Sequence, residues 1–91
     1  MSVSIKKQSD DVFEVTVADI STTTHKVTVT DQTLTDLTYN KLTKTQLLEF
    51  SFGFLLNREP NTSILSSFDI NVISKYFSNY KDKVKRWCDA G

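Results

Sequence analysis

The chain has 91 residues, and its 11 Lys and Arg residues balance its 11 Asp and Glu residues, so the formal net charge is zero. A chain of this length closes only one hydrophobic core, and we expect a single domain over residues 1–91. The charge balance excludes a strong attraction to polyanions, a single cysteine excludes an internal disulfide, and no apolar run is long enough to span a bilayer.

Residues 2–30 show the alternation of apolar and polar residues that is typical of β-strands. It is clear over residues 13–17 and 25–30 and weaker over residues 2–7. Because side chains alternate between the two faces of a strand, the apolar residues of the two clear segments should share one buried face. These residues are Phe13, Val15, Val17, Val27 and Val29. The pattern predicts a small antiparallel meander of two or three strands.

Residues 31–42 carry a weak helical pattern, for which Asp31 is a candidate N-cap. The threonines of this segment and Asn40 favour a turn or a frayed helix instead. Thr43 and Gln46 then have the spacing of a capping box, which predicts the start of the main helix at residue 44. Pro60 disfavours helical backbone at the residue before it, so this helix should cover about residues 44–58.

The predicted helix over residues 44–58 is apolar around about 240° of its circumference, at about 100° per residue. The apolar residues are Leu47, Leu48, Phe50, Phe52, Phe54, Leu55 and Leu56. Only a narrow polar stripe remains, which consists of Gln46, Glu49, Gly53 and Asn57. Such a helix must be covered on more than one side, either by the rest of the chain or by a partner.

The apolar periodicity of residues 69–88 predicts a last helix, with Asp69 as its N-cap. Its apolar stripe contains Ile70, Ile73, Phe77, Tyr80, Val84, Trp87 and Cys88. No Gly or Pro interrupts the segment, so one long helix is expected, and a break at Ser78-Asn79 is the alternative. The predicted architecture is α+β: a small antiparallel sheet within residues 2–30, followed by two main helices packed on one face of the sheet.

The side chains that could support catalysis have simpler structural interpretations. His25 should lie at a strand edge, and the sequence offers no second group to assist it as a general base. Cys88 lies on the apolar stripe, where it should serve as a small hydrophobic residue. No nucleophile–base pair, carboxylate pair or set of metal ligands is visible in the sequence. We therefore predict no enzyme, no cofactor and no metal site.

Two polar segments are candidates for binding. Arg58 and Glu59 precede a loop between rigid elements, where ligands often bind. The alternative for Arg58 is a structural role, in which its positive charge stabilises the negative C-terminal end of the helix dipole. The Lys81–Arg86 face carries four cations that could contact phosphates. Asp82 dilutes this charge, and the spacing favours an ordinary solvated helix face over nucleic-acid recognition.

The second half of the chain contains a distinctive run of residues: Ser51-Phe52-x-Phe54-Leu55-Leu56-x-Arg58-Glu59-Pro60-Asn61-x-Ser63-Ile64-Leu65, followed by Phe68-Asp69-Ile70, Val72-Ile73 and Tyr76-Phe77-x-x-Tyr80. This run resembles a family of small uncharacterised bacterial proteins. The segments 13–17 and 25–30 are similar to that family too. The resemblance implies an α+β fold and a bacterial cytoplasmic origin, and it brings no activity. Asn57 stands where an acidic residue is common, and Ser78 where Pro is common; a Pro there in relatives favours the broken last helix.

These patterns predict a non-enzymatic interaction module in the cytoplasm, whose partner is either a second copy of the chain in a homodimer or another protein. The reason is that the two helices present more apolar surface than a three-stranded sheet can cover. The alternative is a small-ligand or nucleic-acid binder that uses Arg58 and Glu59 or the Lys81–Arg86 face. No membrane partner is expected.

Overall fold

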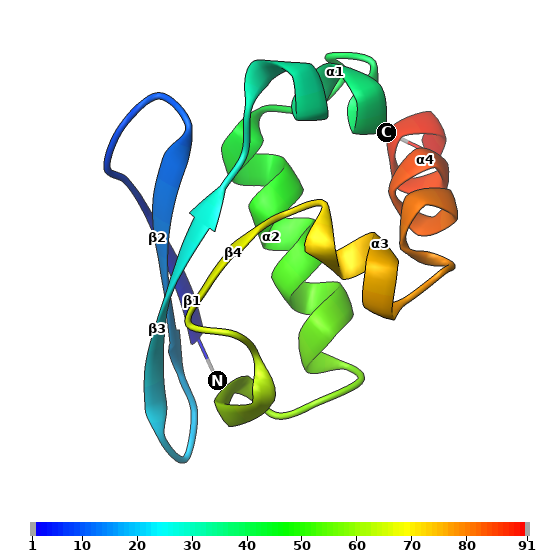
Figure 1. Ribbon diagram of the computed structural model, residues 1–91. Helices are drawn as coiled ribbons and strands as arrows, with labels where there is room; N and C mark the ends of the chain where they lie inside the picture. The colour runs from blue at the N-terminus through cyan, green and yellow to red at the C-terminus, as the bar shows by residue number, and fades with distance from the viewer. Residues whose placement is uncertain (1, 91) are drawn as a thin grey trace.

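The computed structural model describes residues 2–90 and has an α+β fold with a four-stranded mixed sheet (Figure 1). The strands are β1 (Ser2–Lys7), β2 (Val12–Ala18), β3 (Thr22–Thr28) and β4 (Ser67–Asp69). The helices are α1 (Asp31–Thr38), α2 (Lys44–Leu56), α3 (Val72–Tyr76) and α4 (Tyr80–Ala90), with a 3-10 turn η1 (Asn61–Ser63) after α2. Within residues 2–90, no helix is both long and apolar enough to cross a membrane.

The sheet confirms the predicted meander in part and extends it by one strand. β1, β2 and β3 pair antiparallel in chain order, and the apolar residues expected to share a face are all buried. The prediction of a purely antiparallel sheet was wrong, because β4 returns from the second half of the chain and pairs in parallel with β3. The pairing rests on backbone hydrogen bonds from Lys26 to Ser66 (2.8 Å) and from Ile70 to Thr28 (3.0 Å). A three-residue strand has no alternation that a sequence pattern could reveal.

α2 is the central helix of the fold and begins with the predicted capping box. The Oγ1 of Thr43 accepts from the backbone N–H of Gln46 at 3.1 Å, and the Gln46 side chain accepts from the N–H of Thr43 at 2.9 Å. The ring of Phe52 lies 5.5 Å from the ring of His25 in β3, so α2 contacts the sheet directly. The polar stripe is confirmed, because all four of its residues are exposed. α2 ends at Leu56, two residues before the predicted end.

α1 forms where a turn or frayed helix was favoured, and its cap differs from the one expected. Thr30, rather than Asp31, is the N-cap: its Oγ1 accepts from the backbone N–H of Thr33 at 3.1 Å. The helix ends where Tyr39 and Asn40 adopt the left-handed conformation, with φ of 54° and 60°. Asp31 is the first residue of the helix, where its negative charge interacts favourably with the positive end of the helix dipole.

The prediction of one long helix over residues 69–88 is wrong. The structure instead has the break at Ser78-Asn79 that was the alternative, since α3 ends at Tyr76 and α4 begins at Tyr80. Asp69 is the last residue of β4, and its carboxylate accepts from the backbone N–H of Asn71 at 2.9 Å instead of capping a helix. α3 and α4 are separated at Phe77, whose backbone is extended (φ −128°, ψ 99°). This turn brings the rings of Phe77 and Tyr80 to 5.7 and 5.4 Å from the ring of Phe54. The break therefore closes the aromatic core around α2.

Candidate functional site

An open groove lies between α2 and α4. Its lining consists of Glu49, Phe50, Gly53, Phe54, Asn57, Arg58, Lys83 and Trp87. We call it the α2–α4 groove. It contains three of the four residues of the polar stripe of α2, because the fold leaves that stripe uncovered next to α4.

Aromatic side chains make the hydrophobic part of the groove. The rings of Phe50 and Trp87 are stacked, with centroids 4.9 Å apart and an interplanar angle of 18°. Trp87 is 37% exposed, although it belongs to a helix stripe that is otherwise buried at Tyr80, Val84 and Cys88. Stacking of this kind holds a large apolar surface in a fixed orientation toward solvent.

Two cations and one carboxylate complete the groove. The guanidinium of Arg58 turns back along α2: its Nη1 donates to the Phe54 carbonyl at 2.9 Å, and its Cζ lies 3.6 Å from the centroid of the Phe54 ring. Lys83 and Glu49 are exposed. Within residues 2–90, the ion pairs that form involve none of these three side chains. Their charges are therefore available to a partner.

Gly53 lines the groove, and no contact within residues 2–90 requires a glycine at this position. Its backbone is helical, without a positive φ, and a Cβ placed on it would meet no atom within 4 Å. Glycine inside a helix costs about 1 kcal/mol relative to alanine. Close packing against the rest of residues 2–90 therefore does not account for this residue.

The structure divides the residues that the sequence singled out for binding. Arg58 lines the groove, whereas Glu59 is half-buried and lies outside the lining. The Lys81–Arg86 face is also split: Lys83 points to the groove, while Lys81 and Lys85 border a separate depression that contains Asp36 and Asp82. The cations of α4 consequently form no continuous basic surface. The meeting of Arg58 with Lys83 depends on helix packing and could not be read from either segment alone.

His25 is buried inside the sheet, so the expectation of a strand-edge histidine was wrong. β3 lies between β2 and β4, and the His25 ring packs against Phe52 of α2, so only 2% of the residue is exposed. Its Nδ1 lies 2.7 Å from the carbonyl oxygen of Leu65, to which it must donate, because that oxygen can only accept. The Nε2 lies 2.8 Å from the hydroxyl of Thr23, within hydrogen-bond distance. Both ring nitrogens are satisfied, which leaves no free atom for catalysis.

Asn61, in the loop that follows α2, has a structural role. Its side chain is buried and donates to the Ser21 carbonyl and to Thr23 Oγ1, both at 2.9 Å. The amide therefore ties η1 to the turn between β2 and β3 and extends the hydrogen-bonded chain that reaches His25. This residue serves the fold rather than a ligand.

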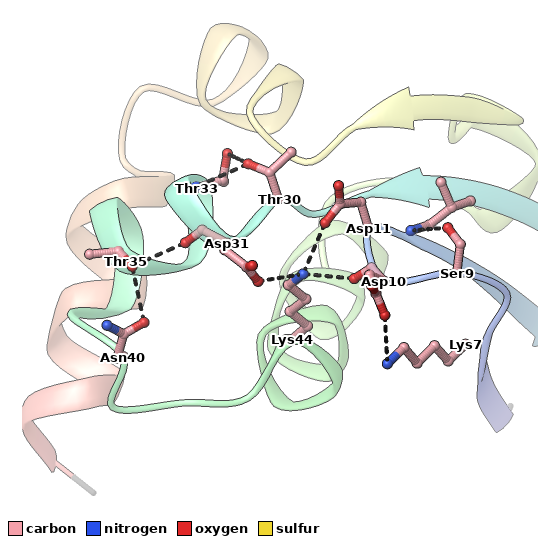
Figure 2. Close-up of polar contacts among 11 residues, drawn as sticks. Lys7, Ser9, Asp10, Asp11, Thr30, Asp31, Thr33, Thr35, Asn40 and Lys44 are labelled. Carbon is pink, nitrogen blue, oxygen red and sulfur yellow. Dashed lines mark hydrogen bonds and ion pairs between the residues drawn. The ribbon is translucent and has the colours of Figure 1, made fainter.

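Lys44 organises the largest polar cluster, which joins the first hairpin, α1 and α2 (Figure 2). Its Nζ lies 2.7 Å from the Asp10 carbonyl oxygen, 2.8 Å from Asp31 Oδ1 and 3.2 Å from Asp11 Oδ1. The hydrogen bond and the charge of Lys44 lower the pKa of Asp31. Burial opposes the charged form of Lys44, but its hydrogen bonds to Asp31 and Asp11 prevail and raise its pKa. The ammonium group donates to all three oxygens and ties the hairpin to both helices, so we assign the cluster to the fold.

Cys88 and an apolar depression beside α3 are the next features to consider. Cys88 is buried as predicted, and burial raises the pKa of its thiol, which disfavours the reactive thiolate. Residues 2–90 contain no group of three or more His, Cys, Asp or Glu side chains that could hold a metal ion. An apolar depression beside α3, bordered by the exposed Leu65 and Tyr76, has no charged side chain to orient a ligand.

Comparison of the chain with protein-family models, with curated proteins and with solved structures found no match. The resemblance to small bacterial proteins therefore stays a hypothesis.

Proposed function

We propose that this protein is a non-enzymatic interaction module of the cytoplasm and that it binds a partner protein through the α2–α4 groove. In this proposal the helices cover one face of the sheet and turn the groove outward. The observation that carries it is Gly53, an exposed helical glycine with open space above it. A residue that weakens its own helix and fits no internal contact is explained by the close approach of another molecule.

The chemistry of the groove supports a protein partner. Aromatic residues and arginine are enriched at the centres of protein interfaces, where they contribute most of the binding energy. Here Trp87, Phe50 and Arg58 are held in fixed orientations by stacking, by a hydrogen bond and by a cation–π contact. Side chains that are already ordered lose less conformational entropy when a partner binds.

Site-specific photocrosslinking tests this function. A photoreactive amino acid would replace Asn57, which is exposed on the rim of the groove, and, as a matched control, Thr24, which is exposed on the far face of the sheet. Irradiation of the full chain in cells or at high concentration should give a discrete adduct from position 57 and none from position 24. Absence of an adduct at position 57, or the same adducts from both positions, would overturn the proposal.

A second candidate function is binding of a small anionic ligand or a nucleic acid, which the meeting of Arg58 and Lys83 in one groove favours. Trp87 is the only tryptophan of the chain, so its fluorescence reports directly on the groove. Titration with inorganic phosphate and with single-stranded RNA at low salt should change this fluorescence if the second candidate is correct, and added salt should reverse the change. A flat titration with both probes would exclude it.

A further inference from the structure

We infer that the partner of the α2–α4 groove is an acidic segment of another protein, which places a carboxylate over Gly53 between Arg58 and Lys83. This inference rests on the proposed function and names the chemistry of its partner. It follows from the level at which the two cations meet along the groove, from the open space above Gly53 and from the apolar surface beside it.

Lys83 faces the groove from α4, and the aromatic contacts on either side of it fix its level. The ring of Phe50 stacks on that of Trp87, whereas the ring of Phe54 lies 5.4 Å from that of Tyr80. α2 and α4 therefore run antiparallel along the groove. Since Lys83 lies between Tyr80 and Trp87 in α4, it lies at the level of the turn between Phe50 and Phe54 in α2.

Arg58 brings a second positive charge to this level. Its Nη1 donates to the Phe54 carbonyl at 2.9 Å and its Cζ lies 3.6 Å from the centroid of the Phe54 ring, so the guanidinium lies beside Phe54. The carboxylate of Glu49 belongs to the turn before Gly53, about 6 Å along the axis at 1.5 Å per residue. Within residues 2–90, Glu49 forms no ion pair with either cation. The groove's own carboxylate therefore leaves the place between the two cations to a partner.

A carboxylate fits the space between the two cations. A Cβ placed on Gly53 would meet no atom within 4 Å, so an incoming side chain can reach the backbone of α2 there. Guanidinium groups form strong and often bidentate hydrogen bonds with carboxylates, and the ammonium group of Lys83 adds further charged donors. One Asp or Glu of a partner would therefore interact with Arg58 and Lys83 together.

The surroundings of this place favour a protein over a nucleic acid. The stacked pair of Phe50 and Trp87 is an apolar surface that apolar side chains next to the carboxylate would cover. Glu49 lines the same groove and would repel a run of phosphates. The net charge of the chain is zero, so no wider positive field supports binding of a polyanion. A single acidic residue among apolar ones meets these conditions.

Selection of short random peptides displayed on phage, with the full chain as the target, tests the inference. Enriched peptides should carry Asp or Glu next to apolar residues, and synthetic versions without tryptophan should change the fluorescence of Trp87 on binding. Arg58→Glu and Lys83→Glu should each weaken this binding at least about tenfold, because each places like charges opposite one another. Lys75→Glu, an equal reversal at an exposed position outside the groove, should leave the binding unchanged.

Two further measurements separate loss of the site from loss of folding. A selected peptide whose acidic residue is replaced by lysine should bind the Lys83→Glu chain more tightly than the wild-type chain. Gly53→Leu fills the place of the carboxylate, so binding of the original peptide should be lost. The thermal unfolding midpoint of Gly53→Leu should nevertheless stay at or above that of the wild-type chain, because the side chain extends into open space and leucine favours a helix more than glycine does.

Several results would overturn the acidic partner. They are a selection that yields no peptide, enriched peptides without acidic residues, and binding that responds to Lys75→Glu as strongly as to Arg58→Glu. A fluorescence change of Trp87 with single-stranded RNA but with none of the selected peptides would assign the two cations to a nucleic acid instead.

The outcomes for the inference and for the proposed function are distinguishable. When the crosslinking from position 57 is repeated in the Lys83→Glu chain, an acidic partner should give less of the adduct. If the yield of the adduct does not change, the interaction module stands with a partner of different chemistry and the acidic partner is overturned. If position 57 crosslinks to nothing in the wild-type chain, both fail.

Discussion

The phenolic oxygen of Tyr80 lies 2.6 Å from the Oγ of Ser51, which joins α4 to α2 by a hydrogen bond inside the core. Ser51 Oγ also lies 2.7 Å from the Leu47 carbonyl oxygen, to which it donates. Its proton is therefore committed, and Tyr80 must be the donor of the bond between them. Both side chains are fully buried, so the fold of the last segment depends on a polar pair that water cannot replace.

Because Tyr80 is the donor and Ser51 the acceptor, removing one hydroxyl should destabilise the protein more than removing the other. Ser51→Ala leaves the Tyr80 hydroxyl buried without a partner and should cost about 2 kcal/mol, whereas Tyr80→Phe removes the donor itself and should cost about 1 kcal/mol. Urea unfolding of both variants and of the double variant measures this. The double variant should be close to Tyr80→Phe. An equal cost for the two single variants would show that the assigned direction is wrong.

Stability should fall at alkaline pH because of the same tyrosine. Burial raises the pKa of Tyr80, and its hydrogen bond with Ser51 offsets only part of this effect. Since the pKa in the folded state lies above the value of about 10 in the unfolded state, the stabilisation is complete below about pH 10 and is lost as the pH rises further. Unfolding midpoints measured from pH 8 to 11 should fall less steeply for Tyr80→Phe. Identical profiles would contradict the prediction.

At acidic pH, the cluster around Lys44 should lose its contribution. The pKa of Asp31 is lowered from its ordinary value of 3.8 by its hydrogen bond with Lys44 and by the charge of that residue. A lowered pKa in the folded state stabilises the protein above that ordinary value, and the benefit is lost as the pH falls through the lowered pKa. Thermal midpoints of the wild-type chain and of Lys44→Met should therefore differ at pH 6, and the difference should narrow as the pH falls below 3.8. Added salt should narrow the difference at pH 6, because Asp31 is exposed.

The loop after α2 should depend on Asn61 and not on its neighbour. Asn61→Ala leaves the Ser21 carbonyl and the Thr23 hydroxyl without their donor and should cost about 2 kcal/mol. Thr62→Ala, at an exposed adjacent position, should stay within about 0.5 kcal/mol of the wild-type chain. Chemical denaturation measures both. Equal losses would mean that the loop tolerates no change at all and that the buried amide has no special role.

Gly53→Ala should stabilise the monomer. The new methyl group meets nothing within 4 Å, and alanine is about 1 kcal/mol more favourable than glycine in a helix interior. Unfolding at a concentration where the chain is monomeric should show a gain of that order. A loss of stability would mean that the glycine has an internal role and would weaken the argument that it serves a partner.

Much of the local structure could be predicted because its causes lie within a few residues of one another. Alternation over residues 13–17 placed one face of β2 in the core, and the spacing of Thr43 and Gln46 placed the start of α2. The helix period separated the polar stripe of α2 from its buried residues, and it placed Cys88 on the buried side of the last helix. Each of these patterns repeats over one or two turns or along one strand, so neighbours in the sequence reveal it.

Tertiary contacts decided the rest, because they join residues that no local pattern relates. β4 is only three residues long and exists through its hydrogen bonds with β3, and His25 is buried by contacts with Phe52 and Leu65, which lie 27 and 40 positions further along the chain. Phe77 leaves the helical conformation although nothing in its own segment forbids a helix, and the turn brings Tyr80 to Ser51. The α2–α4 groove arises in the same way: the sequence determined that Glu49, Gly53 and Asn57 share an exposed stripe. Only the packing of α4 against α2 brought Lys83 and Trp87 beside that stripe, since side chains thirty positions apart meet through the folded chain alone.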